Sequence, residues 1–257
     1  MWEEPCISGV RGSGAVFFSG CSLGCVYCQN RSISAGLFGK TVTVARLRDI
    51  FSELIDKGAH NINLVTPTHY SNVLIKALER PLPVPVVWNT GGYDSVETLR
   101  ALEGKVQIYL TDLKYLSPAL SEKYSGAPDY PESAVAAIDE MFRQTGKYRL
   151  SSDGIMESGV IVRHLVLPGC IENTFDVIDY ISERFGPGDI LFSLMSQYTP
   201  AGDIGGFPNL QRRLTENEYE RVNSYLSLSG IEDGFFQELS SADEEYIPDF
   251  DLTGVLE

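Results

Sequence analysis

Apolar residues recur along the chain in two alternating patterns. Short runs rich in valine, isoleucine and leucine, several of them closed by Gly, Pro or Asn, predict buried β-strands. We expect strands at 15–19, 62–65, 84–88, 106–113, 160–167 and 189–195, with 235–239 as a candidate short final strand. Between these runs, apolar residues spaced three and four positions apart predict helices at 42–56, 70–78, 96–102, 131–145, 173–185 and 214–228.

This alternation limits the fold to two architectures. Strands that alternate with helices form a parallel sheet covered by helices. Six such units build either an open doubly wound sheet or a partial barrel of the TIM type. In both architectures ligands bind beyond the carboxyl ends of the strands. The residues that follow each predicted strand are therefore the first candidates for a functional site.

Composition and charge exclude several classes of protein. The chain has 257 residues, of which 43% are hydrophobic and 21% charged, as is typical of a globular protein. No apolar run reaches the roughly 18 residues of a membrane span, and the first residues lack the pattern of a secretion signal, so we expect a cytoplasmic protein. A net charge of −15 disfavours nucleic acid as a partner.

Acidic residues gather near the end of the sequence. Positions 231–257 contain nine Asp or Glu residues and neither Lys nor Arg. We expect one domain over residues 1–257, in which 231–257 forms an acidic C-terminal extension packed on or near the rest. A docking surface for a basic partner is the alternative interpretation of this segment.

Three of the five cysteines lie within eight residues of one another. Cys21, Cys25 and Cys28 follow the first predicted strand with the spacing Cys-x₃-Cys-x₂-Cys. An odd number of cysteines in a chain without an export signal argues against a disulfide framework. The neighbouring glycines favour a loop over a buried helical stripe. The remaining cysteines, Cys6 and Cys170, are expected to be small core residues.

The chemistry of this loop has two interpretations. Structural zinc takes four ligands, usually as two pairs, so zinc would need Cys170 or a histidine to complete the site in space. Three cysteines instead leave one iron of a four-iron cluster without a protein ligand. An open metal position is where a substrate or cofactor binds.

The loop, with the aromatic residue Tyr27 just before the last cysteine, resembles the signature of the radical S-adenosylmethionine (SAM) superfamily. The resemblance implies a [4Fe–4S] cluster on Cys21, Cys25 and Cys28, with the amino and carboxylate groups of SAM on the open iron and Tyr27 near the adenine. It also favours, of the two architectures, a partial TIM-type (βα)6 barrel with parallel strands.

Further motifs resemble the pyruvate formate-lyase activating enzyme branch, and in particular its short uncharacterised relatives. These motifs lie at 4–9, 29–30, 88–93, 112–115, 163–169, 197–200 and 250–254. The resemblance implies that the chain activates a glycyl-radical enzyme and receives electrons from a reductant such as flavodoxin or ferredoxin. The alternatives are a radical SAM enzyme acting on a small molecule or peptide, and a non-catalytic zinc or iron–sulfur module.

Three strand ends supply candidate SAM-binding residues through this resemblance. Relatives of the branch carry Gly-Gly-Glu after the second strand to bind the methionyl amine, whereas this chain offers the oxygen atoms of Thr66 and Thr68. Asn89, Thr90 and Asp112 stand where the relatives bind the ribose and methionine of SAM, with a monovalent cation nearby. Asn89 replaces an aspartate of those relatives.

Arg163 lies inside the apolar run 160–167. A charge within a buried strand is costly unless it is paired. Arg163 therefore either contacts SAM, as the arginine of the relatives does, or forms an ion pair. Asp112 and Lys114 offer a second candidate ion pair, and His164 is expected to pack on the opposite face of the strand.

Overall fold

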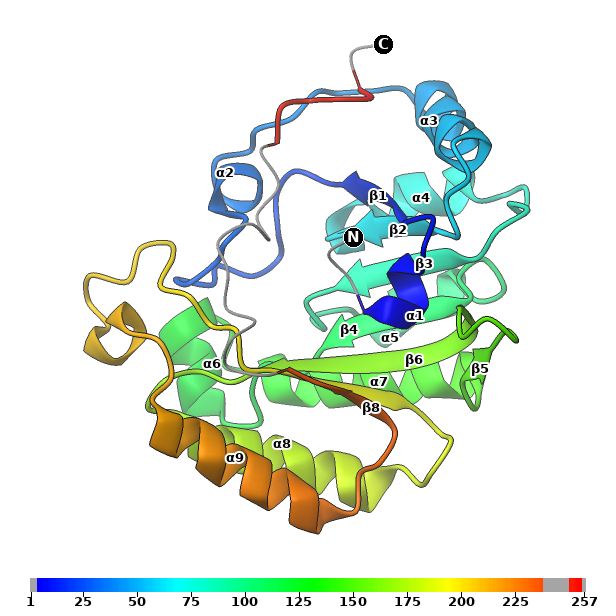
Figure 1. Ribbon diagram of the computed structural model, residues 1–257. Helices are drawn as coiled ribbons and strands as arrows, with labels where there is room; N and C mark the ends of the chain where they lie inside the picture. The colour runs from blue at the N-terminus through cyan, green and yellow to red at the C-terminus, as the bar shows by residue number, and fades with distance from the viewer. Residues whose placement is uncertain (1–3, 238–249, 256–257) are drawn as a thin grey trace.

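A sheet of mostly parallel strands forms the centre of the protein (Figure 1). The computed structural model describes residues 4–237 and 250–255. Its strands are β1 (Gly14–Phe17), β2 (Ile62–Val65), β3 (Val86–Thr90), β4 (Ile108–Asp112), β5 (Arg149–Leu150), β6 (Met156–Leu165), β7 (Leu191–Met195) and β8 (Gly234–Phe236). The order is β1-β2-β3-β4-β6-β7-β8 with every neighbouring pair parallel, and β5 pairs antiparallel with β6. The predicted α/β fold, a partial TIM-type barrel, is confirmed.

Helices cover the outer side of the curved sheet, as Figure 1 shows for α3, α4, α7 and α8. The helices are α1 (Pro5–Ser8), α2 (Arg31–Ser34), α3 (Val44–Asp56), α4 (Ser71–Ala77), α5 (Val96–Ala101), α6 (Pro118–Ser125), α7 (Tyr130–Thr145), α8 (Ile171–Arg184) and α9 (Glu216–Ser229). Two 3₁₀ turns, η1 (Thr68–Tyr70) and η2 (Pro208–Gln211), lie in loops. Because each long helix returns the chain to the amino end of the next strand, the carboxyl ends of the parallel strands all lie at one rim of the barrel.

Alternate residues of each strand enter two separate cores. The larger core lies between the sheet and the helices and includes Trp88, Tyr109 and Val162. The smaller core lies on the inner side and consists of Cys6, Ile7, Val87, Ile108, Leu110, Met156, Ile161 and Leu191. Helix α1 thus fills part of the inner side. Cys6 is a core residue, as expected, and burial raises the pKa of its thiol to about 12.

Each predicted element has an observed counterpart, and four observed elements were not predicted: α1, α2, α6 and β5. Strand β6 begins at Met156, four residues before the predicted start, where it pairs with β5. The final strand occupies Gly234–Phe236, and the last two positions of the predicted range 235–239 lie outside the described residues.

The end of the chain contacts the first strand and the first long helix. Strand β8 of the predicted acidic extension pairs with β7 at one edge of the sheet. Residues 250–255 lie against the other edge, where the rings of Phe250 and Phe17 are 5.3 Å apart and Arg46 donates to the carbonyl oxygen of Gly254 at 3.1 Å. Residues 238–249 and 256–257 of this extension lie outside the described residues. Across the described parts, no helix is long and apolar enough to span a membrane.

His164 connects two layers of the fold, on the face opposite Arg163 as predicted. Its Nδ1 donates to the carbonyl oxygen of Leu113 at 2.6 Å, so Nε2 is left to accept from the Thr174 hydroxyl at 3.0 Å. Complete burial lowers the pKa of the imidazole from 6.5 to about 4. The folded protein therefore holds this ring neutral.

This pKa predicts a specific loss of stability in acid. The unfolded chain binds a proton on His164 below about pH 6.5, whereas the folded chain does so only near pH 4. The stabilisation is therefore complete above pH 6.5 and declines as the pH falls toward 4. Between pH 7 and pH 5 we expect His164 to cost about 2 kcal/mol of unfolding free energy.

Urea titrations of the wild type and of His164→Gln, each at both pH values, measure this cost. The variant should lose about 2 kcal/mol less than the wild type between the two pH values. An identical loss in both proteins would show that His164 is not held neutral by the fold.

Candidate active site

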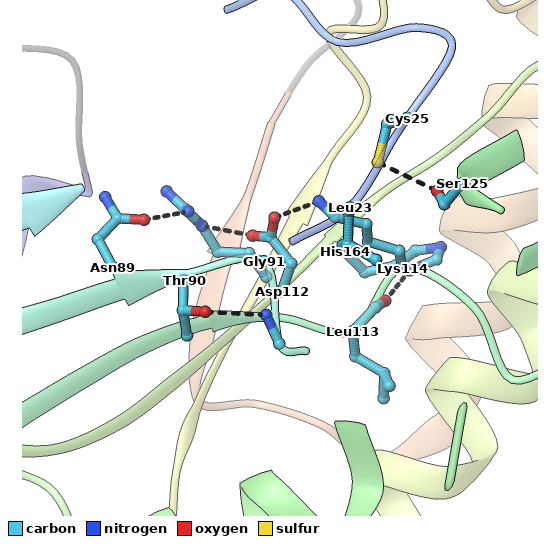
Figure 2. Close-up of polar contacts among 12 residues, drawn as sticks. Leu23, Cys25, Asn89, Thr90, Gly91, Asp112, Leu113, Lys114, Ser125 and His164 are labelled. Carbon is cyan, nitrogen blue, oxygen red and sulfur yellow. Dashed lines mark hydrogen bonds and ion pairs between the residues drawn. The ribbon is translucent and has the colours of Figure 1, made fainter. Parts of the chain in front are cut away.

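A buried carboxylate at the carboxyl end of β4 links three neighbouring strand ends (Figure 2). Asp112 lies directly across from Arg163 in the β4–β6 register, and Arg163 Nε donates to Asp112 Oδ1 at 3.0 Å. Arg163 Nη2 donates to Asn89 Oδ1 of β3 at 2.6 Å. Lys114 Nζ forms an ion pair with Asp112 Oδ2. The structure therefore brings together three predicted site residues and adds Lys114 to them.

The charges of this network stabilise one another. The side chains of Asp112, Arg163 and Lys114 are each at least four-fifths buried. Burial opposes the charged carboxylate, but Lys114 and Arg163 outweigh it and hold the pKa of Asp112 below its usual value. Asp112 in turn raises the pKa of Lys114. Both ion pairs that the sequence offered as alternatives are thus present, and Asp112 is shared between the two cations.

The cysteine loop follows β1 and reaches the same rim. Cys21 is exposed, whereas Cys25 and Cys28 are partly buried, and all three are free thiols. Cys25 Sγ lies 3.0 Å from Ser125 Oγ, and Cys28 Sγ lies 3.3 Å from Ser34 Oγ. The backbone N–H of Leu23 donates to Cys21 Sγ at 3.4 Å. Each sulfur thus has a polar neighbour of the kind that stabilises a thiolate.

Two opposing effects set the acidity of these thiols. Burial raises the pKa of Cys21 and of Cys25. The positive charge of Lys114 lowers both, and Ser125 also lowers that of Cys25. A metal that binds a thiolate displaces the proton and removes the burial cost. Cys21 and Cys25 are therefore neutral thiols when no metal is bound, and they become thiolates when they ligate a metal.

The donor set of the loop suits an iron–sulfur cluster chemically. Three thiols from one loop, with polar neighbours and a nearby cation, match the all-cysteine ligation of such clusters. Within residues 4–237 and 250–255, no three Cys, His, Asp or Glu side chains are gathered closely enough to hold an ion. Cluster binding therefore requires the sulfur atoms of this loop to converge.

Tyr27 connects the loop to the body of the protein. Its buried hydroxyl lies 2.6 Å from that of Tyr115, which lies 3.0 Å from Ser125 Oγ, the same atom that contacts Cys25. The Tyr27 ring also packs edge-on against Tyr198 at 6.3 Å. Since neither Tyr115 nor Ser125 was identified from the sequence, this support for Cys25 emerges only from the structure.

Glycine allows a second loop to support the cysteines. Gly202, in the Gly-rich loop at 201–208, has a φ of +78°, and a side chain there would meet the carbonyl oxygen of Val26 at 2.2 Å. This approach lets the next residue, Asp203, donate its backbone N–H to Val26 at 2.8 Å. The loop at 201–208 therefore contacts the cysteine loop.

The threonines after β2 and β3 surround a carboxylate that the sequence did not single out. Asp94 is buried and accepts hydrogen bonds from Thr68 at 2.8 Å, from Thr90 at 2.5 Å and from the Trp88 indole at 3.2 Å. Burial raises the pKa of Asp94, and these hydrogen bonds partly offset the rise. Thr68 and Thr90 thus use their hydroxyl groups within the protein, and the Thr68 carbonyl oxygen accepts from the Ser71 N–H.

Thr66 has an unfavourable backbone conformation. Its φ is +59°, a left-handed value that is rare for a β-branched residue. The turn is fixed by a hydrogen bond from the Thr66 N–H to the carbonyl oxygen of Asn89 at 2.8 Å. Strain of this kind often accompanies a functional site. The only sequence signal for it was the Thr-Pro pair that ends the strand.

The charge network predicts a large stability difference between two aspartate variants. Asp112→Ala leaves Arg163 and Lys114 without their shared carboxylate and should destabilise the fold by about 3–5 kcal/mol. Asp203→Ala removes an exposed partner of Arg31 at 3.8 Å and should cost less than about 1 kcal/mol. Urea denaturation measures both. Equal costs would show that the Asp112 network contributes little to stability.

Comparisons with known proteins agree with this site. A sequence model of the radical SAM superfamily matches residues 15–156, which include the cysteine loop, Asn89 and Asp112. The chain is also similar to an uncharacterised protein of Methanocaldococcus jannaschii, with 31% identity over 221 residues that cover 82% of this chain and 60% of the relative. The chain thus spans about 60% of the length of that relative. It belongs to the radical SAM superfamily, whose enzymes use a [4Fe–4S] cluster and SAM.

Proposed function

We propose that Cys21, Cys25 and Cys28 ligate the cluster and that the protein cleaves SAM at the rim beside them. The observation that supports this most is the position of the three free thiols at the end of β1, on the rim that also holds Asp112, Arg163 and Lys114. Ligands of parallel barrels bind at this rim. We also propose that residues 1–257 act as one domain.

Held by Cys21, Cys25 and Cys28, the cluster would supply one electron for the cleavage of the S–C5′ bond of SAM, and the products would be methionine and a 5′-deoxyadenosyl radical able to take a hydrogen atom from the substrate. The protein's part is to bind and orient SAM. Lys114 and Arg163 are two cations that suit the methionyl carboxylate. The carbonyl oxygen of Thr66, and the second lone pair of the Thr68 carbonyl oxygen that already accepts from Ser71, suit the N–H groups of the methionyl amine.

The remaining proposed contacts lie around the methionyl carboxylate and amine of SAM. Asn89 and Thr90 end β3 and Asp112 ends β4, so we assign them to the ribose and methionine region, with Arg163 positioned by Asn89 and Asp112. Tyr27 is assigned to the adenine end, and its buried hydroxyl restricts it to contact through the ring edge or backbone. Asp94 positions Thr68 and Thr90 without itself reaching the ligand.

The substrate that we propose is a glycine residue on a partner protein, so that the chain activates a glycyl-radical enzyme. The motifs shared with the pyruvate formate-lyase activating enzyme branch support this proposal, among them the 112–115 segment that supplies Asp112 and Lys114. The loss of Gly-Gly-Glu after β2 sets the chain apart from that branch. A reductant such as flavodoxin or ferredoxin would supply the electron.

SAM cleavage tests the proposal directly. Anaerobic reconstitution should give about four irons per chain, and dithionite with SAM should then yield 5′-deoxyadenosine and methionine, measured by liquid chromatography and mass spectrometry. Omission of dithionite is the control. If the iron is bound but SAM stays intact, the enzymatic proposal is wrong.

The same assay separates the substrate classes. A candidate glycyl-radical enzyme labelled with deuterium on its glycine α-carbons should transfer deuterium into 5′-deoxyadenosine and should acquire a glycyl radical detectable by electron paramagnetic resonance. SAM cleavage without transfer from any such partner would reject the activase role and favour a small molecule or another peptide.

A further inference from the structure

The charge of the protein is distributed unevenly about the cysteine loop. Residues 5–48 contain five Lys or Arg residues and neither Asp nor Glu, although the whole chain has 35 acidic residues and a net charge of −15. This segment includes β1, the cysteine loop and α2. A strongly acidic protein thus has its longest acid-free segment at the proposed cluster.

Part of this segment folds into an exposed surface directly beside Cys21. Gly36 N–H donates to the carbonyl oxygen of Arg31 at 2.9 Å, and Phe38 N–H donates to that of Ser32 at 3.2 Å, so the 36–40 loop folds back on α2. Ser19 Oγ donates to the carbonyl oxygen of Phe38 at 2.6 Å. These bonds hold the loop against the residues that precede Cys21.

The turn at Gly20 brings a third segment to the same surface. Gly20 has a φ of +87°, and a side chain there would meet His69 at 3.0 Å and Leu37 at 3.6 Å. His69 Nε2 contacts the carbonyl oxygen of Ser19 at 2.7 Å and its ring packs on Tyr70 at 4.4 Å. Leu37 therefore lies near Gly20, and Tyr70 reaches the same area through its contact with His69.

We call this surface the Gly20 face and define it by five residues around Gly20 and Cys21: Arg31, Leu37, Phe38, Lys40 and Tyr70. Leu37, Phe38 and Tyr70 are 68%, 45% and 38% exposed. Lys40 is exposed, and Arg31 is half exposed with only a distant contact to Asp203. Apolar side chains surrounded by basic ones are typical of a surface that binds an acidic protein.

We propose that the Gly20 face is the docking surface for an acidic one-electron carrier protein of the flavodoxin or ferredoxin type. The proposal rests on the proposed function, which requires an electron at the cysteine loop. Cys21 is the most exposed of the three cysteines and lies at the edge of this face. Carrier and cluster exchange one electron, so the carrier is oxidised, the cluster is reduced, and no atom is transferred.

Charge explains why the docking surface is placed here. Elsewhere the net negative protein repels an acidic carrier, and long-range steering depends on a local field of opposite sign. Electron-transfer complexes are small and transient, so a few basic side chains around an apolar centre are sufficient. The C-terminal residues 250–255 contact Phe17 and Arg46.

The test is a binding measurement on the anaerobically reconstituted protein with FMN-loaded bacterial flavodoxin, by isothermal titration calorimetry at low and high ionic strength. The wild type should bind at low ionic strength and weaken as salt is added. Arg31→Glu combined with Lys40→Glu should weaken binding by about tenfold or more and reduce the salt dependence. Phe38→Ser should also weaken binding, with the salt dependence retained.

The matched control is Lys57→Glu, a charge reversal at the far end of α3 that should change the dissociation constant less than about twofold. Three results would each overturn the proposal. The wild type could fail to bind flavodoxin, the double variant could keep the wild-type dissociation constant, or Lys57→Glu could weaken binding as much as the double variant does. Dithionite bypasses the carrier and tests the proposed function separately. Flavodoxin binding without dithionite-driven SAM cleavage would leave the docking surface in place and reject the function.

Discussion

The shared carboxylate of Asp112 is the interaction on which the rim of this barrel depends. Asp112 alone would be costly to bury, as would Arg163 or Lys114. Together they place two cations against one anion at the ends of β4 and β6, while Asn89 extends the contacts to β3. The result is a fixed arrangement of two cations around one carboxylate, at the place where a parallel barrel binds its ligands.

The cysteine loop depends on that arrangement and on contacts from distant segments. Burial raises the pKa of Cys21 and Cys25, Lys114 partly offsets the rise, and Ser125 lies at hydrogen-bond distance from Cys25. Tyr115 joins Ser125 to Tyr27, so α6 and the residues after β4 support the loop from one side. The 201–208 loop supports it from the other side through Val26. Ligation of a cluster would thus draw together sulfur atoms whose surroundings are already in place.

The sequence predicted those parts of the fold and site that local patterns determine. Apolar runs ended by Gly, Pro or Asn located the main strands, and the cysteine spacing located the loop. Helix α6 was missed because its apolar periodicity is weak, although Ser117 and Pro118 form a recognisable helix start. Asp94 and Ser125 were missed because their importance comes from pairing across the fold, with Thr68 and with Cys25, which no local pattern encodes.

The identity of the cluster ligands is the central claim, and iron content in single cysteine variants tests it most directly. After anaerobic reconstitution, Cys21→Ala, Cys25→Ala and Cys28→Ala should each lose the cluster, as measured by iron per chain and by the visible absorption of iron–sulfur charge transfer. Cys6→Ala and Cys170→Ala should retain it, because Cys6 lies in the inner core and Cys170 packs beside Tyr124. Full iron content in any of the first three variants, or loss in either of the last two with the fold intact, would contradict the assignment.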